Sequence, residues 1–105
     1  MKLMTKSIEK KLTPRSEIDP GLDSKVVVKY FNPCGSGTWL ITNGEQQEDG
    51  DWLLYGYAHI FCWEWGYVLL SELASIRTRP FGLGIERDLY CEGQTVRELA
   101  EQVGF

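Results

Sequence analysis

The sequence is short of the residues on which most catalytic sites depend. It has one histidine, His59, in 105 residues, so a Ser-His-Asp or Cys-His arrangement would have to use that side chain. His59 lies between Ala58 and Ile60 and shortly before Cys62 in a segment typical of a strand. The sequence pattern shows no third residue that would orient an imidazole base. We therefore interpret His59 as a core or rim residue rather than a general base.

Cysteine is also scarce. Cys34, Cys62 and Cys91 are far apart and odd in number, which excludes a complete disulfide framework. Each is most simply a small buried apolar residue. The alternative is a Cys₃His zinc site that includes His59, but structural zinc sites usually show two close ligand pairs, and here only His59 and Cys62 are close. We predict no metal and no cofactor, and whether these four side chains converge stays open.

Long hydrophobic runs and nucleotide-binding loops are absent. No apolar run approaches the roughly 20 residues that cross a bilayer, and the opening MKLMTKSIEKKL lacks the apolar region of a secretory signal. The segment FGLGIE (81–86) lacks the glycine spacing of a dinucleotide-binding loop. With 43% hydrophobic and 25% charged residues, the composition predicts one folded domain over residues 1–105, which we expect to be cytoplasmic.

Positive charge is missing from the middle of the chain. Residues 30–76 contain no Lys or Arg, although they contain Glu45, Glu48, Asp49, Asp51, Glu64 and Glu72. This argues against a broad phosphate-binding surface there, because phosphate contacts need basic side chains. An acidic region suits a basic partner. The alternative is that acidic loops only keep a sheet soluble.

The segments that are present predict an α+β domain. Successive strands joined by short loops indicate an antiparallel meander of three to five strands, with helices packed on one face. We expect an N-terminal helix, a short helix near 71–77 that Ser71 caps, and a C-terminal helix that begins with the capping box of Thr95 and Glu98. The expected helices are 5–12, 71–77 and 95–105, and the expected strands are 25–31, 38–42, 52–60, 66–70 and 86–91. The polar segment 43–51 is expected at a hairpin tip.

Two short motifs carry candidate functional residues. Alternation in a strand places Trp63 and Trp65 on one face and Glu64 on the other, and we expect at least one aromatic residue of 61–65 to be exposed at a turn. Adjacent Glu86, Arg87 and Asp88 (ERD) cannot share a face either, since Arg87 would oppose its neighbours. We favour a structural ion pair in which Arg87 binds a carboxylate. The alternative is a general acid/base pair of Glu86 and Asp88.

Several motifs resemble a known bacterial family. VKYFNP (28–33), TW (38–39), GYVLLSEL (66–73) and GLGIERDLY (82–90) follow one another as in the family known as domain of unknown function twenty-nine fifty-eight, and the opening MTKSIEKKL is similar too. The resemblance covers nearly the whole chain. It implies no catalytic residues, because the family carries no assigned activity. It implies a context in plasmids, integrative elements and phages, near conjugation, DNA-modification or antirestriction genes.

We therefore predict a non-enzymatic accessory protein of a mobile genetic element that acts by binding a protein. Its most specific form is a counter-defence inhibitor, anti-CRISPR or antirestriction, that occupies a basic nucleic-acid groove. The residues expected to carry binding are acidic, with two apolar anchors: Glu45, Glu48, Asp49, Asp51, Glu64, Trp63 and Trp65. A first alternative is a nucleic-acid-associated module that uses Lys2, Lys6, Lys10 and Lys11. A second is a small enzyme or zinc protein. The sequence does not determine the oligomeric state.

Overall fold

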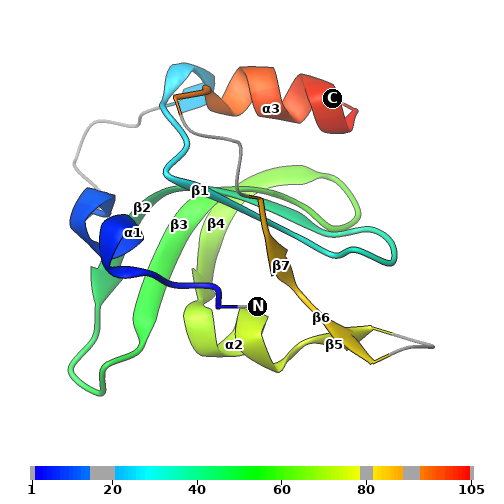
Figure 1. Cartoon of the computed structure of the whole chain (residues 1–105). Coiled ribbons are helices and arrows are strands. Elements are labelled where there is room, and N and C mark those ends of the chain that lie inside the picture. Colours follow the sequence, from blue (N-terminus) through cyan, green and yellow to red (C-terminus); the bar gives the residue numbers. More distant parts are fainter. Residues whose placement is uncertain (1, 15–20, 79–81, 89–92, 105) are drawn as a thin grey trace.

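An antiparallel sheet of five strands organises the chain in a computed structural model that describes residues 2–14, 21–78, 82–88 and 93–104. The strands stand in the order β4-β3-β2-β1-β7, so β4 forms one edge and β7 the other (Figure 1). The strands are β1 (Val28–Phe31), β2 (Thr38–Gln46), β3 (Trp52–His59), β4 (Trp63–Leu69) and β7 (Glu86–Arg87). A separate pair joins β5 (Arg77–Thr78) to β6 (Leu83–Gly84). The predicted α+β meander is confirmed.

Helices cover both faces of this sheet, not one face as expected from the sequence. In Figure 1, α3 (Val96–Val103) lies on one side of the sheet, and α1 (Lys6–Lys11) and α2 (Leu70–Ser75) lie on the other. A short 3₁₀ helix, η1 (Gly21–Asp23), lies beside α3. The physical reason is in β2, where Trp39, Leu40 and Ile41 are consecutive and all buried. Because neighbouring strand residues point to opposite faces, both faces are apolar and both need cover.

Two hydrophobic clusters result. The larger one lies under α1 and α2 and includes Leu12, Tyr30, Ile41, Leu54 and Leu73. The smaller one lies under α3, and its buried members are Val26, Leu40, Val96, Leu99 and Ala100. In the first cluster the Tyr30 hydroxyl donates a 2.7 Å hydrogen bond to the Leu3 carbonyl, which fastens the N-terminal segment to the sheet.

Some element boundaries differ from the predictions. Strand β4 begins at Trp63, so the connection from β3 is only residues 60–62. Strand β2 continues to Gln46, so the polar segment 43–51 is partly strand. Helix α2 begins at Leu70 with Leu69 as its N-cap, which makes Ser71 a residue of the first turn. The expected strand 86–91 is observed over Glu86–Arg87, and residues 89–91 lie outside the described residues.

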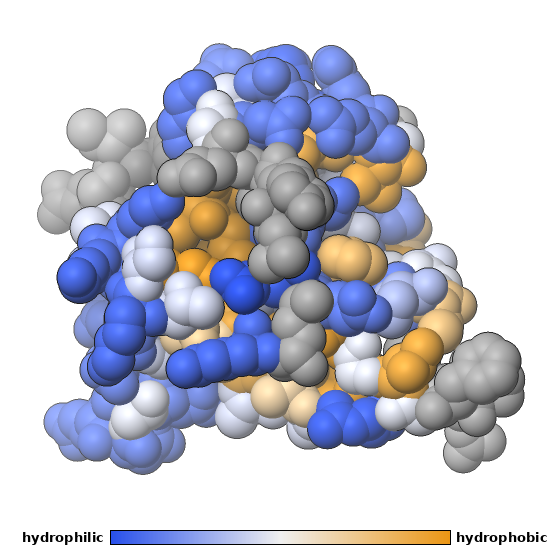
Figure 2. All heavy atoms as spheres, viewed as in Figure 1, coloured by the Kyte–Doolittle hydropathy of each residue, from blue (hydrophilic) through white to orange (hydrophobic). Residues whose placement is uncertain are grey.

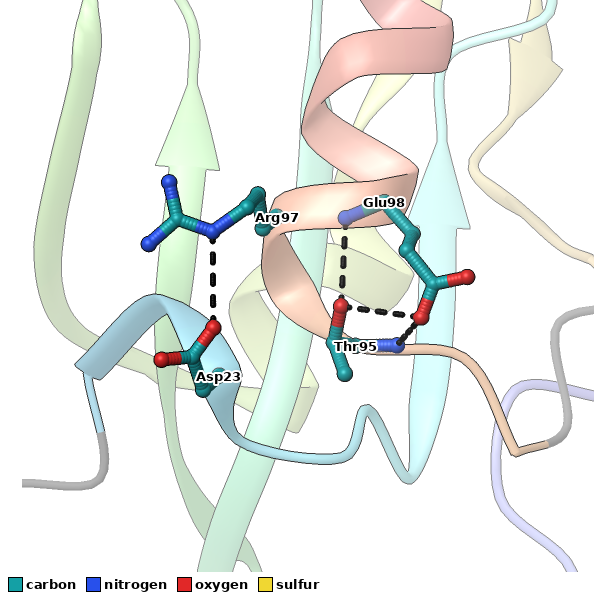
Figure 3. Close-up of polar contacts among 4 residues, drawn as sticks. All are labelled: Asp23, Thr95, Arg97 and Glu98. Carbon is teal, nitrogen blue, oxygen red and sulfur yellow. Dashed lines mark hydrogen bonds and ion pairs between the residues drawn. The ribbon is translucent and has the colours of Figure 1, made fainter.

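The C-terminal helix has the predicted capping box (Figure 3). The Glu98 backbone N–H donates to Thr95 Oγ1 at 3.2 Å, and the Thr95 backbone N–H donates to Glu98 Oε1 at 3.2 Å. Gly104 ends the helix at a φ of 123°, which favours glycine. Arg97 Nε lies 3.4 Å from Asp23 Oδ1 and links α3 to η1. These contacts hold α3 over the sheet.

The surface in Figure 2 is mainly hydrophilic over the outer side of α3 and over α1. Hydrophobic residues show at the C-terminal end of α3 and beside β6, where Val103 is 40% exposed and Leu83 is 44% exposed. Within the described residues, no helix has both the length and the apolar character needed to cross a membrane.

Candidate functional site

The most distinctive surface lies along β4, which is one of the two edge strands of the sheet. An edge strand presents backbone N–H and C=O groups that a further strand can use. The turn before β4 carries Ile60, which is 47% exposed, and Phe61, which is 96% exposed, and Tyr67 within β4 is 55% exposed. We call this surface, formed by β4 with Ile60, Phe61 and Tyr67, the apolar edge. The expectation of an exposed aromatic residue in 61–65 is confirmed by Phe61.

Aromatic rings form a ladder on the α3 side of β3 and β4. The register pairs Tyr57 with Trp65 and Tyr55 with Tyr67, which puts their side chains on one face. Ring centroids lie 4.9 Å apart for Tyr57 and Trp63, 4.8 Å for Tyr57 and Trp65, and 4.9 Å for Tyr55 and Tyr67. Stacked and tilted rings at such distances stabilise a hairpin beyond simple burial. The ladder therefore makes the β3–β4 hairpin a firm platform.

The two tryptophans predicted as anchors lie in this ladder. Trp63 and Trp65 are half-buried and pack against the cluster under α3. Trp63 Nε1 donates a 3.3 Å hydrogen bond to the Gly104 carbonyl at the end of α3. Their shared face is confirmed, with Glu64 on the other face. They position the hairpin, and the most exposed ring of the ladder itself is Tyr67.

A groove lies on the opposite face of β4. It encloses about 360 Å³ and is lined by Trp39, Ile41, Ala58, Ile60, Glu64 and Val68, with the paired glycines Gly56 and Gly66 between the strands. We call it the glycine groove. Glu64 is the only side chain with a formal charge among these described lining residues. The groove is thus apolar, with one carboxylate on the edge strand.

The two glycines have different roles. A Cβ on Gly56 would lie 2.0 Å from the Leu40 carbonyl oxygen and 2.8 Å from Ile41 Cα, so β2 and β3 approach too closely there for any side chain. The same place has a register irregularity between Ile41 and Asn43. A Cβ on Gly66 would meet nothing within 4 Å. Gly56 is therefore required by the fold, whereas Gly66 leaves the groove open.

The acidic residues at the tip of the β2–β3 hairpin form a separate surface. Glu45, Glu48 and Asp49 are exposed there. The register places the tip near the pair Leu53–Leu69, while Glu64 pairs with Ala58 toward the other end of β3. Five residues of strand, roughly 17 Å, separate Glu64 from Leu69. The structure therefore does not bring Glu64, Trp63 and Trp65 together with the acidic tip.

Asp51, the fourth acidic residue of that segment, caps the N-terminal turn of α2 from outside the helix. Its Oδ1 accepts hydrogen bonds from the Ser71 N–H at 3.1 Å and the Trp52 N–H at 2.8 Å, and its Oδ2 accepts one from the Ser71 hydroxyl at 2.5 Å. The N-cap residue, Leu69, has no side-chain acceptor, so Asp51 supplies one from a distant turn. The Ser71 hydroxyl first, and then the backbone N–H groups, hold the pKa of the Asp51 carboxyl below its ordinary value.

The ERD motif is built into the sheet. Arg87 pairs with Tyr30 and Glu86 with Phe31, so Arg87 points to the opposite face from its two neighbours, as predicted. The Asp88 N–H donates to the Lys29 carbonyl at 2.9 Å, and Asp88 Oδ2 lies 3.7 Å from Lys29 Nζ. The ion pair thus joins Asp88 to β1. Burial raises the pKa of the Tyr30 hydroxyl, and the nearby positive charge of Arg87 offsets part of that rise.

The cysteines are not where the sequence suggested. Cys34 and Cys62 are exposed, so the expectation that they are buried is wrong for both. They lie in the tight β1–β2 and β3–β4 connections, where the Cys34 N–H donates to Asn32 Oδ1 at 2.9 Å. Cys91 lies outside the described residues. Across residues 2–14, 21–78, 82–88 and 93–104, no three His, Cys, Asp or Glu side chains come together to hold a metal ion.

The basic residues of the nucleic-acid alternative lie at the N-terminus. Lys2, Lys6, Lys10 and Lys11 are all exposed, and Lys6 Nζ lies 3.4 Å from Glu9 Oε2. Lys6 and Lys10 fall on one side of α1, since they are four residues apart on a helix. The helix is held by Ile8, which is buried in the larger cluster.

Sequence reasoning missed the glycine groove and the full extent of the apolar edge. The available signal was a single glycine inside each of two strands, Gly56 between tyrosines and Gly66 between Trp65 and Tyr67. An isolated glycine in a strand indicates a bulge or a close approach of backbones. The pattern does not reveal that the two glycines face each other, because that depends on the hairpin register.

Comparison with known proteins identifies the family. A family model described as "Protein of unknown function (DUF2958)" matches residues 3–102, and the chain therefore belongs to the DUF2958 family. No curated protein and no solved structure matches the chain.

Proposed function

We propose that this member of the DUF2958 family is a non-enzymatic accessory protein that acts by binding another protein. The observation that carries the proposal is the apolar edge. Phe61 is 96% exposed at a hairpin tip, beside the 47% exposed Ile60. Large exposed apolar side chains that lie close together are typical of interaction surfaces, and aromatic residues dominate their binding energy. The aromatic ladder below the tip keeps this surface rigid.

The charge on β4 and on the separate acidic tip of the β2–β3 hairpin favours a basic partner. Residues 30–76 contain no Lys or Arg, and they include the exposed Glu45, Glu48, Asp49 and Glu64. Complementary charge accelerates association and disfavours wrong partners. We further propose a mobile-element setting in the host cytoplasm, with an antirestriction or anti-CRISPR inhibitor as the most specific form. That part is supported by the context which the family resemblance implies and by the absence of Lys and Arg from residues 30–76.

The test is affinity capture from the native host with and without nuclease. The bait is the wild-type chain beside Phe61→Ser, with Leu83→Ser as the matched control, because Leu83 is 44% exposed on the separate β5–β6 pair. We expect one protein partner that resists nuclease, is lost with Phe61→Ser and is kept with Leu83→Ser. Partners that vanish with nuclease would contradict the proposal and favour binding of nucleic acid through Lys2, Lys6, Lys10 and Lys11.

A charge-reversed bait distinguishes binding through the acidic tip from binding through the apolar edge. Replacing Glu45 and Glu48 by Lys changes the hairpin tip and keeps Asp49 Oδ1, which accepts the Asp51 N–H at 3.0 Å, so that Asp51 can still hold α2. If the inhibitor form is right, this variant loses its partner as well. If it keeps the partner while Phe61→Ser does not, binding is confined to the apolar edge and the acidic tip is not part of the contact.

A further inference from the structure

We infer that the apolar edge and the glycine groove together receive an extended basic segment of the partner, which pairs as a strand with β4 and lays an Arg or Lys side chain over Gly66 toward Glu64. The inference rests on the proposed function, because it names the chemistry of the partner at that surface. It goes further in assigning the groove a ligand: a cation carried on an apolar stem.

The edge supplies the backbone part of such a contact. Strand β4 spans Trp63–Leu69 and is the terminal strand of the sheet, so within the described residues no strand lies on its outer side. On an antiparallel strand, alternate residues direct their N–H and C=O groups away from the inner neighbour. An added strand bonds to those groups, and alternate side chains of that strand fall on each face of the sheet. Half of them therefore reach the groove face.

The groove supplies the specificity. Its volume of about 360 Å³ is at the lower end of the range for ligand sites and is sufficient for one long side chain. Gly66 has nothing within 4 Å of the position where a side chain would begin, so the path from the edge into the groove is open. Ala58, Ile41 and Val68 provide an apolar lining for the methylene stem of Arg or Lys, and Glu64 provides the countercharge.

The charge distribution decides between a basic partner and a second copy of the chain. Two β4 strands paired about Gly66 would bring two Glu64 carboxylates to the interface and no cation, because residues 30–76 contain neither Lys nor Arg. A basic strand neutralises Glu64 instead. Self-association is therefore the outcome that the inference excludes.

The test uses short capped peptides of alternating Thr and Val with Arg at the centre, and a control peptide with Gln at that position. Binding is followed by ¹⁵N–¹H NMR on the whole chain through the amides of Glu64, Gly66 and Val68. We expect the Arg peptide to bind about fivefold more tightly than the Gln peptide, which is the strength of one exposed ion pair. The preference should vanish in Glu64→Gln and persist in the matched control Glu48→Gln.

Gly66→Val probes the groove without using charge. Its side chain extends into the groove, and its Cβ meets no other atom of the chain, so we expect thermal stability to be kept and binding of the Arg peptide to be lost. Equal binding of the two peptides, perturbations that avoid β4, or binding unchanged by Gly66→Val would each overturn the inference. So would dimerisation of the free chain through β4 in sedimentation experiments.

The capture and peptide experiments together distinguish a failure of this inference from a failure of the proposed function. If the host partner is lost with Phe61→Ser but binds Glu64→Gln and Gly66→Val as well as wild type, the proposed function stands and the inference fails. If no nuclease-resistant partner is captured and the Arg peptide still shows its Glu64-dependent preference, the groove has the inferred chemistry and the proposed function is wrong.

Discussion

The paired glycines of the β3–β4 hairpin allow one substitution to be compared at two directly opposed positions. Gly56 and Gly66 face each other in the register. In Gly56→Ala the new Cβ would lie 2.0 Å from the Leu40 carbonyl oxygen, more than an ångström closer than an ordinary contact, which begins at 3.4 Å. Because that oxygen is backbone, β2 and β3 have to separate. In Gly66→Ala the new Cβ meets nothing within 4 Å.

The expected stabilities follow from these distances. Overpacking of this kind costs about 1–3 kcal/mol, and ladder hydrogen bonds stretched by the separation add about 1 kcal/mol each. We expect Gly56→Ala to lower the free energy of unfolding by about 3 kcal/mol, which is roughly 12–24 °C in Tm for a domain of this size. Gly66→Ala lowers the conformational entropy of the unfolded chain and adds no clash in the folded one. It should therefore raise the free energy of unfolding by about 0.5 kcal/mol.

The assay is thermal and urea denaturation of both variants and wild type, followed by circular dichroism. The measured quantity is the difference in Tm between the two alanine variants. A Gly56→Ala protein as stable as Gly66→Ala would refute the close approach of β2 and β3, and with it the geometry of the glycine groove.

Four further predictions concern other contacts. Thr95→Ala removes the N-cap of α3 and should lower the unfolding free energy by about 1 kcal/mol in urea titrations; an unchanged midpoint would show that the capping box is not formed. The Asp51 carboxyl has a lowered pKa in the folded state, so its contribution to stability is complete above the ordinary value of 3.8 and is lost as pH falls through the folded pKa; Asp51→Asn should lower Tm at pH 7 and flatten the loss of Tm below pH 4. Tyr30→Phe leaves the buried Leu3 carbonyl without its donor and should cost about 1 kcal/mol, measured by the same denaturation, whereas no effect would remove Tyr30 as the anchor of the N-terminal segment. Cys34 and Cys62 are exposed, so both should react with a maleimide under native conditions, and mass spectrometry that finds either one unmodified would contradict its placement.

The start of α3 and the strand alternation could be predicted from the sequence because they depend on neighbours within a few residues, whereas the predicted cap of α2, Ser71, was wrong. Thr95 and Glu98 stand at the spacing of a capping box, and the structure has that box. Trp63 and Trp65 follow the two-residue period of a strand, and they share a face. Four successive strands with short connections left only an antiparallel meander. Predicting these features requires no information on contacts between distant segments.

The candidate site could not be predicted, because it depends on register and on contacts between distant segments. The groove exists only because Gly56 lies opposite Gly66, and neither residue signals the other. Asp88 forms an ion pair with Lys29 on β1, because the last strand along the chain pairs with the first. Asp51 looked like one more exposed acid, but α2 folds back onto it. In each case the missing information is a pairing that local patterns do not contain.

The account's central claim is that a protein partner binds through the apolar edge. The most direct test is quantitative capture from nuclease-treated host lysate with wild-type and Phe61→Ser baits side by side. The account predicts one stoichiometric protein on the wild-type bait and roughly a tenfold or greater loss with Phe61→Ser, the effect expected of a central aromatic anchor. Equal recovery on both baits, or recovery only where nucleic acid is intact, would contradict it.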